Sequence, residues 1–276
     1  MEVPVTRVVL NGVGKLGRAV IAAAQTKQDE DAADENPVEI VAGVDKHLVD
    51  AARQKGLTGE GAPPVIVDGV PVYETLGDVT EQFDVLFDAS RAEGLVDILS
   101  FALANDLPLV VAATGHSDGQ LLRLKRASLK IPILRSTNLS LGVNVTRRLA
   151  ESAAKMLGDV DVEIVETHHR MKVDAPSGTA LTLAQAVRDA TGTNRPFVYG
   201  RGPEAPGERG NEIAIHALRG GTVVGEHTVS FLLEDEMVEI RHVALSRKVF
   251  GFGGLEAVRF VAGAAPGLYD MGDLLD

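Results

Sequence analysis

The first half of the chain alternates short apolar runs with segments that repeat apolar positions at helical spacing. Apolar runs rich in β-branched residues are typical of strands buried on both faces of a parallel sheet, and amphipathic helices connect such strands. The pattern therefore predicts a parallel α/β domain. Its expected strands are residues 6–10, 38–44, 84–88, 109–112 and 131–134, and its expected helices are residues 15–27, 92–105, 119–128 and 142–157.

The pattern changes from about residue 160. Strand-like runs at residues 160–165, 212–217, 222–232 and 236–245 follow one another with one intervening helix, expected at residues 179–190. This order favours a mixed or antiparallel sheet over further crossover units, so we expect a second domain that starts near Leu141. A last helix is expected at residues 254–262, ahead of a tail rich in Pro and Gly.

Two further stretches predict loops. Residues 28–36 are polar and mostly acidic, which is typical of a solvated connection. Residues 193–210 contain repeated Pro and Gly, the composition of a long loop.

A glycine-rich turn follows the first expected strand. Gly12, Gly14 and Gly17 have the spacing Gly-x-Gly-x-x-Gly between an apolar strand and an amphipathic helix. Glycines at this spacing permit a tight turn, let the backbone approach a pyrophosphate and let the helix pack closely, while the helix N-terminus faces the anion. The motif predicts a dinucleotide site, and glycines that serve only a turn are the alternative.

Asp45 ends the second expected strand, where such folds place the acid that binds the ribose hydroxyls. An acid at this place favours NAD, whereas a cation beside it favours the extra phosphate of NADP. Because Lys46 follows Asp45 directly, we expect both NADH and NADPH to be accepted.

The segment between residues 166 and 180 concentrates titratable and cationic side chains. His168 and His169 are adjacent and Lys172 follows closely, in a chain that is otherwise acidic. Proton donors beside positive charge suit an anionic substrate that must be protonated. Ser177 precedes an expected helix and is a candidate N-cap, and the N–H groups next to it are candidates for binding a carboxylate. A satisfied histidine pair and an ordinary helix cap are the alternative.

Composition narrows the possible partners. The 276 residues include 27 Lys and Arg against 39 Asp and Glu, a formal net charge of −12, which disfavours nucleic acid and anionic membranes. The chain contains no cysteine, and it lacks the apolar runs of a membrane span or a secretory signal. Adjacent residues of a strand point to opposite faces, so the histidine pair predicts no metal site. We expect a cytoplasmic protein.

Residues 166–180 read Glu-Thr-His-His-Arg-Met-Lys-Val-Asp-Ala-Pro-Ser-Gly-Thr-Ala. This segment resembles the signature of the 4-hydroxy-tetrahydrodipicolinate reductase (dihydrodipicolinate reductase) family, Glu-x-His-His-x-x-Lys-x-Asp-Ala-Pro-Ser-Gly-Thr-Ala, at every specified position. The resemblance extends over nearly the whole chain, including the glycine turn, residues 136–144, residues 219–228 and residues 266–271.

The resemblance implies an oxidoreductase that uses NADH or NADPH to reduce 4-hydroxy-tetrahydrodipicolinate to tetrahydrodipicolinate in lysine and diaminopimelate biosynthesis. It implies a Rossmann-like nucleotide-binding domain made of residues 1–140 and 246–276. It also implies a mixed α+β domain with an open mixed sheet, residues 141–245, which binds the dicarboxylate substrate and forms a homotetramer.

Roles for single residues follow from the same resemblance. His168 matches the proton donor and Lys172 the substrate-binding cation, with Lys172 as the second candidate for the acid. The substrate carboxylates are expected at His169, Ser177, Gly178 and Thr179. The cofactor is expected at Gly12, Gly14, Lys15, Leu16, Gly17, Asp45, Lys46, Ala112, Thr114, Ser136, Asn138 and Leu139.

Several positions depart from the family pattern. They are Asn11, Gly12, Lys15 and Leu16 in the glycine turn, Ala112 and Ala113 after a later strand, and His116 and Leu139 where Phe is common. These departures keep two alternatives open: a paralogous reductase of another carboxylated cyclic imine, and a dinucleotide-binding sensor without turnover. The presence of both His168 and Lys172 argues against the sensor.

Overall fold

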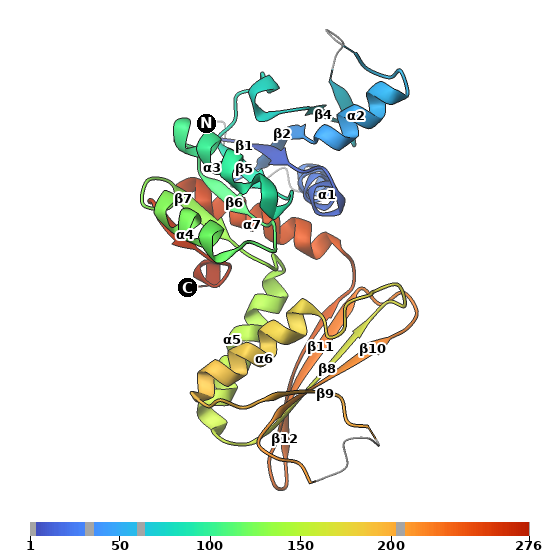
Figure 1. Cartoon of the computed structure of the whole chain (residues 1–276), viewed down its shortest axis with the longest axis vertical. Helices are drawn as coiled ribbons and strands as arrows, with labels where there is room; N and C mark the ends of the chain where they lie inside the picture. Colours follow the sequence, from blue (N-terminus) through green and yellow to red (C-terminus); the bar gives the residue numbers. More distant parts are fainter. Residues whose placement is uncertain (1–3, 31–35, 60–63, 203–207, 276) are drawn as a thin grey trace. The chain divides into compact units, whose positions relative to one another are not determined.

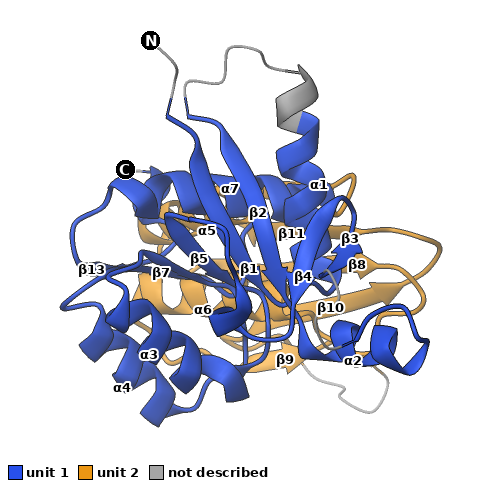
Figure 2. Ribbon diagram, turned by 90° about the horizontal axis from the view of Figure 1, so that it is seen from above, with its two compact units in different colours: residues 1–140, 248–276 blue, residues 141–247 orange. Residues whose placement is uncertain are grey.

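The computed structural model describes residues 4–30, 36–59, 64–202 and 208–275. The chain forms two compact units (Figure 2): unit 1 comprises residues 1–140 and 248–276, and unit 2 comprises residues 141–247. Within the described ranges, no helix combines the length and the apolar character needed to cross a membrane.

Unit 1 is built on an eight-stranded sheet (Figure 1). Its strands are β1 (Thr6–Asn11), β2 (Val38–Val44), β3 (Val65–Val67), β4 (Val70–Tyr73), β5 (Val85–Asp88), β6 (Leu109–Val111), β7 (Pro132–Arg135) and β13 (Gly267–Tyr269). They lie in the order β3-β4-β2-β1-β5-β6-β7-β13, and only the β3–β4 pair among them is antiparallel. The chain leaves β1 toward β2 and later returns to β5 on the other side of β1. Open α/β sheets bind ligands at the carboxyl ends of the strands where the order reverses in this way.

Helices cover both faces of this sheet. They are α1 (Lys15–Glu30), α2 (Lys46–Gln54), α3 (Leu95–Ala104), α4 (Asp118–Ala127) and α7 (Lys248–Gly263), with short 3-10 turns at Leu76–Asp78, Ala92–Gly94 and Asp273–Leu275. Helices α3 and α4 share a core with Val9 and Leu86. Neighbouring strand residues face the other side, and there Phe87 lies next to Gly254 of α7. Helix α7 also packs against α1.

Unit 2 is a five-stranded mixed sheet covered on one face by two helices. Its elements are α5 (Leu141–Leu157), β8 (Asp161–His168), α6 (Gly178–Thr191), β9 (Phe197–Tyr199), β10 (Ile213–Arg219), β11 (Gly225–Leu232) and β12 (Met237–Ala244). The strand order is β12-β11-β8-β10-β9, with β10 parallel to β8 and β9, and β11 antiparallel to β8 and β12. Val162 and Ile164 of β8 join a core with Ala184 and Val187 of α6.

The predicted fold class, a Rossmann-like α/β domain with a second mixed-sheet domain, is confirmed. Some boundaries are wrong. Residues 28–30 belong to α1 instead of a loop, because Gln and Glu are good helix formers, while residues 31–35 lie outside the described residues. Helix α7 starts at Lys248 instead of residue 254. Its glycines look like helix breakers, but a Cβ on Gly251 would lie 2.1 Å from the carbonyl oxygen of Ala19, so glycine is required for close packing on α1.

Several short elements escaped prediction. Helix α2 and strands β3 and β4 were not expected, β9 lies inside the predicted long loop, and β13 lies in the predicted tail. Strands of three residues, such as β3, β9 and β13, show too little alternation to be recognised without their partners. The helix expected from residue 92 begins as the turn Ala92–Gly94, and only then becomes α3.

Candidate active site

The end of β8 carries polar side chains on the face that packs against the helices. Val162 and Ile164 belong to the core, and Glu166 and His168 follow at the same alternation of side chains. Glu166 is fully buried, and His168 is 8% exposed. Strand β8 extends to His168, beyond its predicted end at residue 165. The prediction stopped too early because the polar residues Glu166 and His168 interrupt the apolar alternation.

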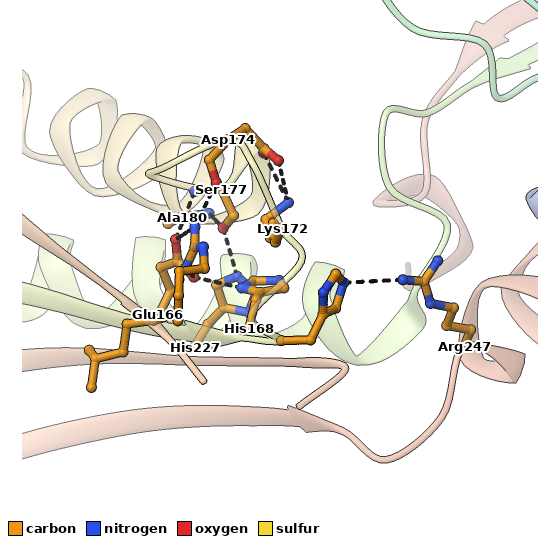
Figure 3. Close-up of polar contacts among 11 residues, drawn as sticks. Glu166, His168, Lys172, Asp174, Ser177, Ala180, His227 and Arg247 are labelled. Atoms are coloured by element: carbon orange, nitrogen blue, oxygen red, sulfur yellow. Dashed lines mark hydrogen bonds and ion pairs between the residues drawn. The ribbon is translucent and has the colours of Figure 1, made fainter. Parts of the chain in front are cut away.

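Four hydrogen bonds converge on the carboxylate of Glu166, and Figure 3 shows Glu166 beside two of the donors, His168 and Ser177. Arg219 donates from Nη1 to Oε2 and from Nη2 to Oε1, both at 2.8 Å. Nδ1 of His168 lies 2.6 Å from Oε2, and the backbone N–H of Ser177 donates to Oε1 at 2.9 Å. Burial alone would raise the pKa of Glu166, but these hydrogen bonds hold it below its usual range. Glu166 is therefore an ionised carboxylate inside the protein.

Two histidine rings meet beside this carboxylate. His168 and His227 pack edge to face, with ring centroids 5.2 Å apart. Burial lowers the pKa of His168, although the Glu166 carboxylate acts in the opposite direction. Burial and the neighbouring His168 lower the pKa of His227 to about 4, so His227 is neutral at physiological pH. Its Nε2 lies 3.0 Å from Oγ of Ser177.

The loop after β8 places a cation near the histidines. Nζ of Lys172 lies 2.9 Å from both carboxylate oxygens of Asp174 (Figure 3), and this contact lowers the pKa of Asp174. Arg219 also donates to the backbone carbonyl of Asp174 at 2.6 Å, which ties the loop to β10. Nε2 of His169 accepts a hydrogen bond from Nη2 of Arg247 at 3.2 Å.

Ser177 ends this loop as the N-cap of α6. Its Oγ accepts from the N–H of Ala180 at 3.2 Å and pairs with His227, and its own N–H binds Glu166. Ser177 is only 2% exposed, so its N–H and hydroxyl serve the protein interior. Gly178 and Thr179 follow as the first residues of α6, and they are more accessible. The N-terminus of a helix presents backbone N–H groups that suit a carboxylate.

The glycine turn of unit 1 has two kinds of glycine. Gly12 has a φ of +95°, and a Cβ on it would lie 2.8 Å from backbone atoms of Ala89 and Ser90. A Cβ on Gly17 would lie 2.3 Å from the carbonyl oxygen of Gly12. Both are therefore required by the turn itself. Around Gly14, in contrast, no atom lies within 4 Å of a Cβ position, and this open space at the start of α1 fits a pyrophosphate.

Asp45, expected to bind the ribose, and Lys46, expected to favour the additional phosphate of NADPH, already have partners in unit 1. Asp45 is the N-cap of α2, where it accepts from the N–H of Leu48 at 3.2 Å, and it also accepts from the N–H of Val13 at 3.1 Å. Nζ of Lys46 lies 2.5 Å from Glu74. Sequence reasoning missed the capping role of Asp45, although Asp before a helical segment is a typical N-cap.

The remaining expected cofactor residues lie after parallel strands of the same sheet. Lys15 and Leu16 start α1 after β1. Ser136 and Leu139 are buried, and Oγ of Ser136 donates to the carbonyl oxygen of Asn138 at 2.7 Å. The expected cofactor residues therefore all follow parallel strands at one edge of the sheet. They are Gly12, Gly14, Lys15, Leu16, Gly17, Asp45 and Lys46 after β1 and β2, and Ala112, Thr114, Ser136, Asn138 and Leu139 after β6 and β7.

Sequence reasoning missed several residues that the structure places in these regions. Asp88 is fully buried at the end of β5, and its Oδ1 accepts from Nδ2 of Asn11 at 3.1 Å. Burial raises the pKa of Asp88. Glu166, Arg219 and His227 lie in segments that carry the family resemblance, but no role was predicted for them. The signal for Glu166 was its place on β8, two residues after a core position.

A glycine turn at the switch point of a parallel sheet is typical of dinucleotide-binding proteins, and a buried carboxylate beside a histidine is typical of enzymes that move protons. Joined in one chain, these features define a two-domain oxidoreductase with a Rossmann-like unit. Comparison with known proteins supports this class. The family model described as "Dihydrodipicolinate reductase, N-terminus" matches residues 6–139, and the one described as "Dihydrodipicolinate reductase, C-terminus" matches residues 142–275. The chain belongs to the 4-hydroxy-tetrahydrodipicolinate reductase family.

Individual relatives can be aligned with this chain over almost its whole length. The 4-hydroxy-tetrahydrodipicolinate reductase of Caldanaerobacter subterraneus subsp. tengcongensis is 43% identical over 271 residues, 98% of each chain. That of Clostridium botulinum is 38% identical over 272 residues, again 98% of each chain. Among solved structures, dipicolinate-bound dihydrodipicolinate reductase from Paenisporosarcina sp. TG-14 has a TM-score of 0.76 at 24% identity, covering 97% of this chain and 98% of that one. This structure confirms the fold.

Proposed function

We propose that this protein reduces 4-hydroxy-tetrahydrodipicolinate to tetrahydrodipicolinate, with NADH or NADPH as reductant, in lysine and diaminopimelate biosynthesis. The observation that carries the proposal is the buried Glu166–His168 pair, followed in the chain by Lys172 and by the N-terminus of α6. This arrangement supplies a proton donor and two places for carboxylates. The names of relatives that are 43% and 38% identical support the substrate, and the biosynthetic role supports a cytoplasmic location.

Unit 1 is proposed to hold the dinucleotide. The open space at Gly14 and the N-terminus of α1 suit the pyrophosphate. When bound, the nicotinamide supplies the hydride. Each carboxylate oxygen of Asp45 accepts one backbone N–H and retains a lone pair for a ribose hydroxyl. Lys46 is proposed to tolerate the additional phosphate of NADPH, in competition with its partner Glu74.

Unit 2 is proposed to hold the dicarboxylate substrate. Gly178 and Thr179 offer the helix N-terminus, while Lys172 and His169 offer side-chain donors. The ammonium of Lys172 has three hydrogens, so a hydrogen remains for a substrate carboxylate when Asp174 accepts two. Ser177 supports binding by capping α6, since its own N–H and hydroxyl are engaged in the interior.

His168 is proposed to supply the proton. After water leaves the 4-hydroxy ring, the unsaturated ring takes up a hydride and a proton, and a positioned acid lowers the barrier to the second transfer. Lys172 is the second candidate for this acid. Its ammonium is paired with the Asp174 carboxylate in the loop after β8.

The assay is the oxidation of NADH and NADPH by the purified protein with freshly generated substrate. We expect substrate-dependent oxidation of both nucleotides, with His168→Ala as the matched inactive control. Oxidation no faster than that of the control would overturn the proposal. Turnover only with another carboxylated cyclic imine would identify a paralogous reductase, and tight nucleotide binding without any turnover would identify a sensor.

A homotetramer held by the sheet of unit 2 is also proposed. The helices cover one face of this sheet, and the strand register places exposed apolar side chains together on the other face. These are Val165, Leu218, Leu232, Met237 and Val243. We expect light scattering to give the mass of a tetramer at micromolar concentration, and Leu218→Glu to lower it. A monomeric parent protein would contradict the proposal.

A further inference from the structure

The hydrogen bonds to Glu166 account for the whole acceptor capacity of its carboxylate. A carboxylate has about four lone-pair sites on two oxygens. Oε1 accepts from Nη2 of Arg219 and from the N–H of Ser177, and Oε2 accepts from Nη1 of Arg219 and from His168. The side chain is fully buried, so it acts through these neighbours instead of by contact with the substrate.

This arrangement decides which nitrogen of His168 carries a hydrogen. An ionised carboxylate accepts hydrogen bonds and cannot donate one. The 2.6 Å contact between Oε2 of Glu166 and Nδ1 of His168 therefore requires a hydrogen on Nδ1. The other ring nitrogen, Nε2, then holds a lone pair in the neutral ring and a hydrogen in the protonated ring. Nε2 is the atom that can release and recover a proton.

Gly225 lies next to that atom and has no side chain to cover it. A Cβ on Gly225 would lie 3.0 Å from Nε2 of His168 and 3.5 Å from Cδ2. A side chain at this position would therefore cover Nε2 or displace the ring, because close-packed interiors leave little space for adjustment. The two ring nitrogens therefore have different neighbours: Glu166 pairs with Nδ1, and Gly225 places no side chain against Nε2.

The titratable and charged groups around His168 lie on four segments of unit 2. Glu166 lies on the same strand, Arg219 on β10, His227 on β11, and Lys172 in the loop after β8. Burial and the cations Lys172 and Arg219 disfavour a proton on His168, whereas the Glu166 carboxylate favours it. His227 is neutral and contributes no charge near pH 7. Glu166 is therefore the group among these four that favours the protonated, acidic form of His168.

We propose that Glu166 is a positioning residue that fixes a hydrogen on Nδ1 of His168 and thereby dedicates Nε2 to proton transfer during the reduction. The transfer step rests on the function proposed above, whereas the position of the hydrogen does not. Because Glu166 also binds the N–H of Ser177, the same carboxylate orients the His168 ring and holds the cap of α6.

The first test compares Glu166→Gln with Glu163→Gln. Glu163 lies on the same strand and makes the same kind of contact, 2.6 Å from Nε2 of His216, but it takes no part in the proposed chemistry. For Glu166→Gln we expect kcat to fall about 100-fold or more, the range for a disabled general acid, with a smaller change in KM. The high-pH limb of kcat/KM should move to lower pH by about one unit or more, because an adjacent opposite charge is lost. Glu163→Gln should keep the parent pH profile, with its oligomer checked by light scattering.

The second test needs no turnover. Nitrogen NMR of the parent protein with labelled histidine, assigned with His168→Ala, should show neutral His168 protonated on Nδ1. A hydrogen on Nε2 in the neutral ring would overturn the proposal, and so would a Glu166→Gln protein that keeps the parent pH profile. A parent protein without reductase activity would refute the proposed function, while the NMR result would still decide where the hydrogen lies.

Discussion

Strand β8 carries two Glu–His pairs that share a contact distance and differ in their surroundings. Oε2 of Glu166 lies 2.6 Å from Nδ1 of His168 on the face covered by helices, and Oε2 of Glu163 lies 2.6 Å from Nε2 of His216 on the open face. The side chain of Glu166 is fully buried, whereas that of Glu163 is 22% exposed and that of His216 is 30% exposed.

We infer from this difference that burial, and not the contact itself, suits the Glu166–His168 pair to the proposed proton transfer. In the single chain, water and the nearby Arg209 and Arg201 compete for Glu163, so this partly exposed pair can exchange partners at a lower cost than a buried one. Around Glu166 each donor is fixed, and a lost partner leaves a charge in a poorly solvated place. The buried pair therefore holds one protonation pattern, which a proton-transfer step requires.

The largest expected difference between the pairs is in turnover. His168→Ala should lower kcat by about two to four orders of magnitude, the usual contribution of one general acid, and kcat/KM should fall with it. His216→Ala should change kcat less than about threefold, because His216 lies on the open face of the sheet and its pair with Glu163 is partly exposed to water. Steady-state kinetics with both variants make the measurement. If His168→Ala only raised KM, the acid would have to be reassigned to Lys172.

The second-largest difference between the two Glu–His pairs is expected in the free energy of unfolding. Glu166→Ala removes the partner of Arg219 and His168 inside the protein, and breaking a buried ion pair costs about 3–5 kcal/mol. Glu163→Ala should cost no more than about 1 kcal/mol. Urea unfolding with a common slope would measure both. Equal losses in the two variants would show that burial does not distinguish the pairs.

Access to Nε2 of His168 can be changed without altering any charge. Gly225→Ala places a methyl group 3.0 Å from Nε2, and we expect kcat to fall about ten- to hundredfold because the ring is covered or displaced. Gly220→Ala is the control, since no atom lies within 4 Å of a Cβ there. Turnover by Gly225→Ala at the parent rate would mean that proton transfer does not pass through this side of the ring.

Acid should weaken the buried pair in a defined pH range. The pKa of Glu166 is lowered in the folded protein, so its contribution to stability is present above the unfolded pKa, about 4.3, and is lost as the pH falls through the folded pKa. The unfolding free energy of the parent should therefore drop more steeply below about pH 4.3 than that of Glu166→Gln. Parallel pH profiles for the two proteins would contradict the assignment.

The smallest effect is expected at an exposed ion pair in unit 1. Lys46 pairs with Glu74 at the surface, so Lys46→Ala should lower the NADPH-to-NADH ratio of kcat/KM by less than about fivefold, as for other exposed charges. Lys55→Ala, at the other end of α2, should leave the ratio unchanged. An unchanged ratio in Lys46→Ala as well would remove Lys46 from cofactor selection.

Local sequence patterns were sufficient for the fold class and for part of the site. The strand, glycine turn and helix around Gly12, Gly14 and Gly17 are contiguous in the chain, so their spacing alone predicted them. The alternation along β8 also places Glu166 and His168 on the face of Val162 and Ile164. That signal was present in the sequence, although polar residues at core positions concealed it.

Only the tertiary structure decided the partners of these residues. Strand register sets His227 opposite Glu166 and Arg219 opposite His168. Packing likewise decided that Gly251 belongs inside a helix and that a side chain at Gly225 would press against the His168 ring. Alternation and turn spacing reflect the local geometry of the backbone, which neighbouring residues determine. Register and close packing depend on the combined burial of the whole sheet and its helices, and no single segment carries that information.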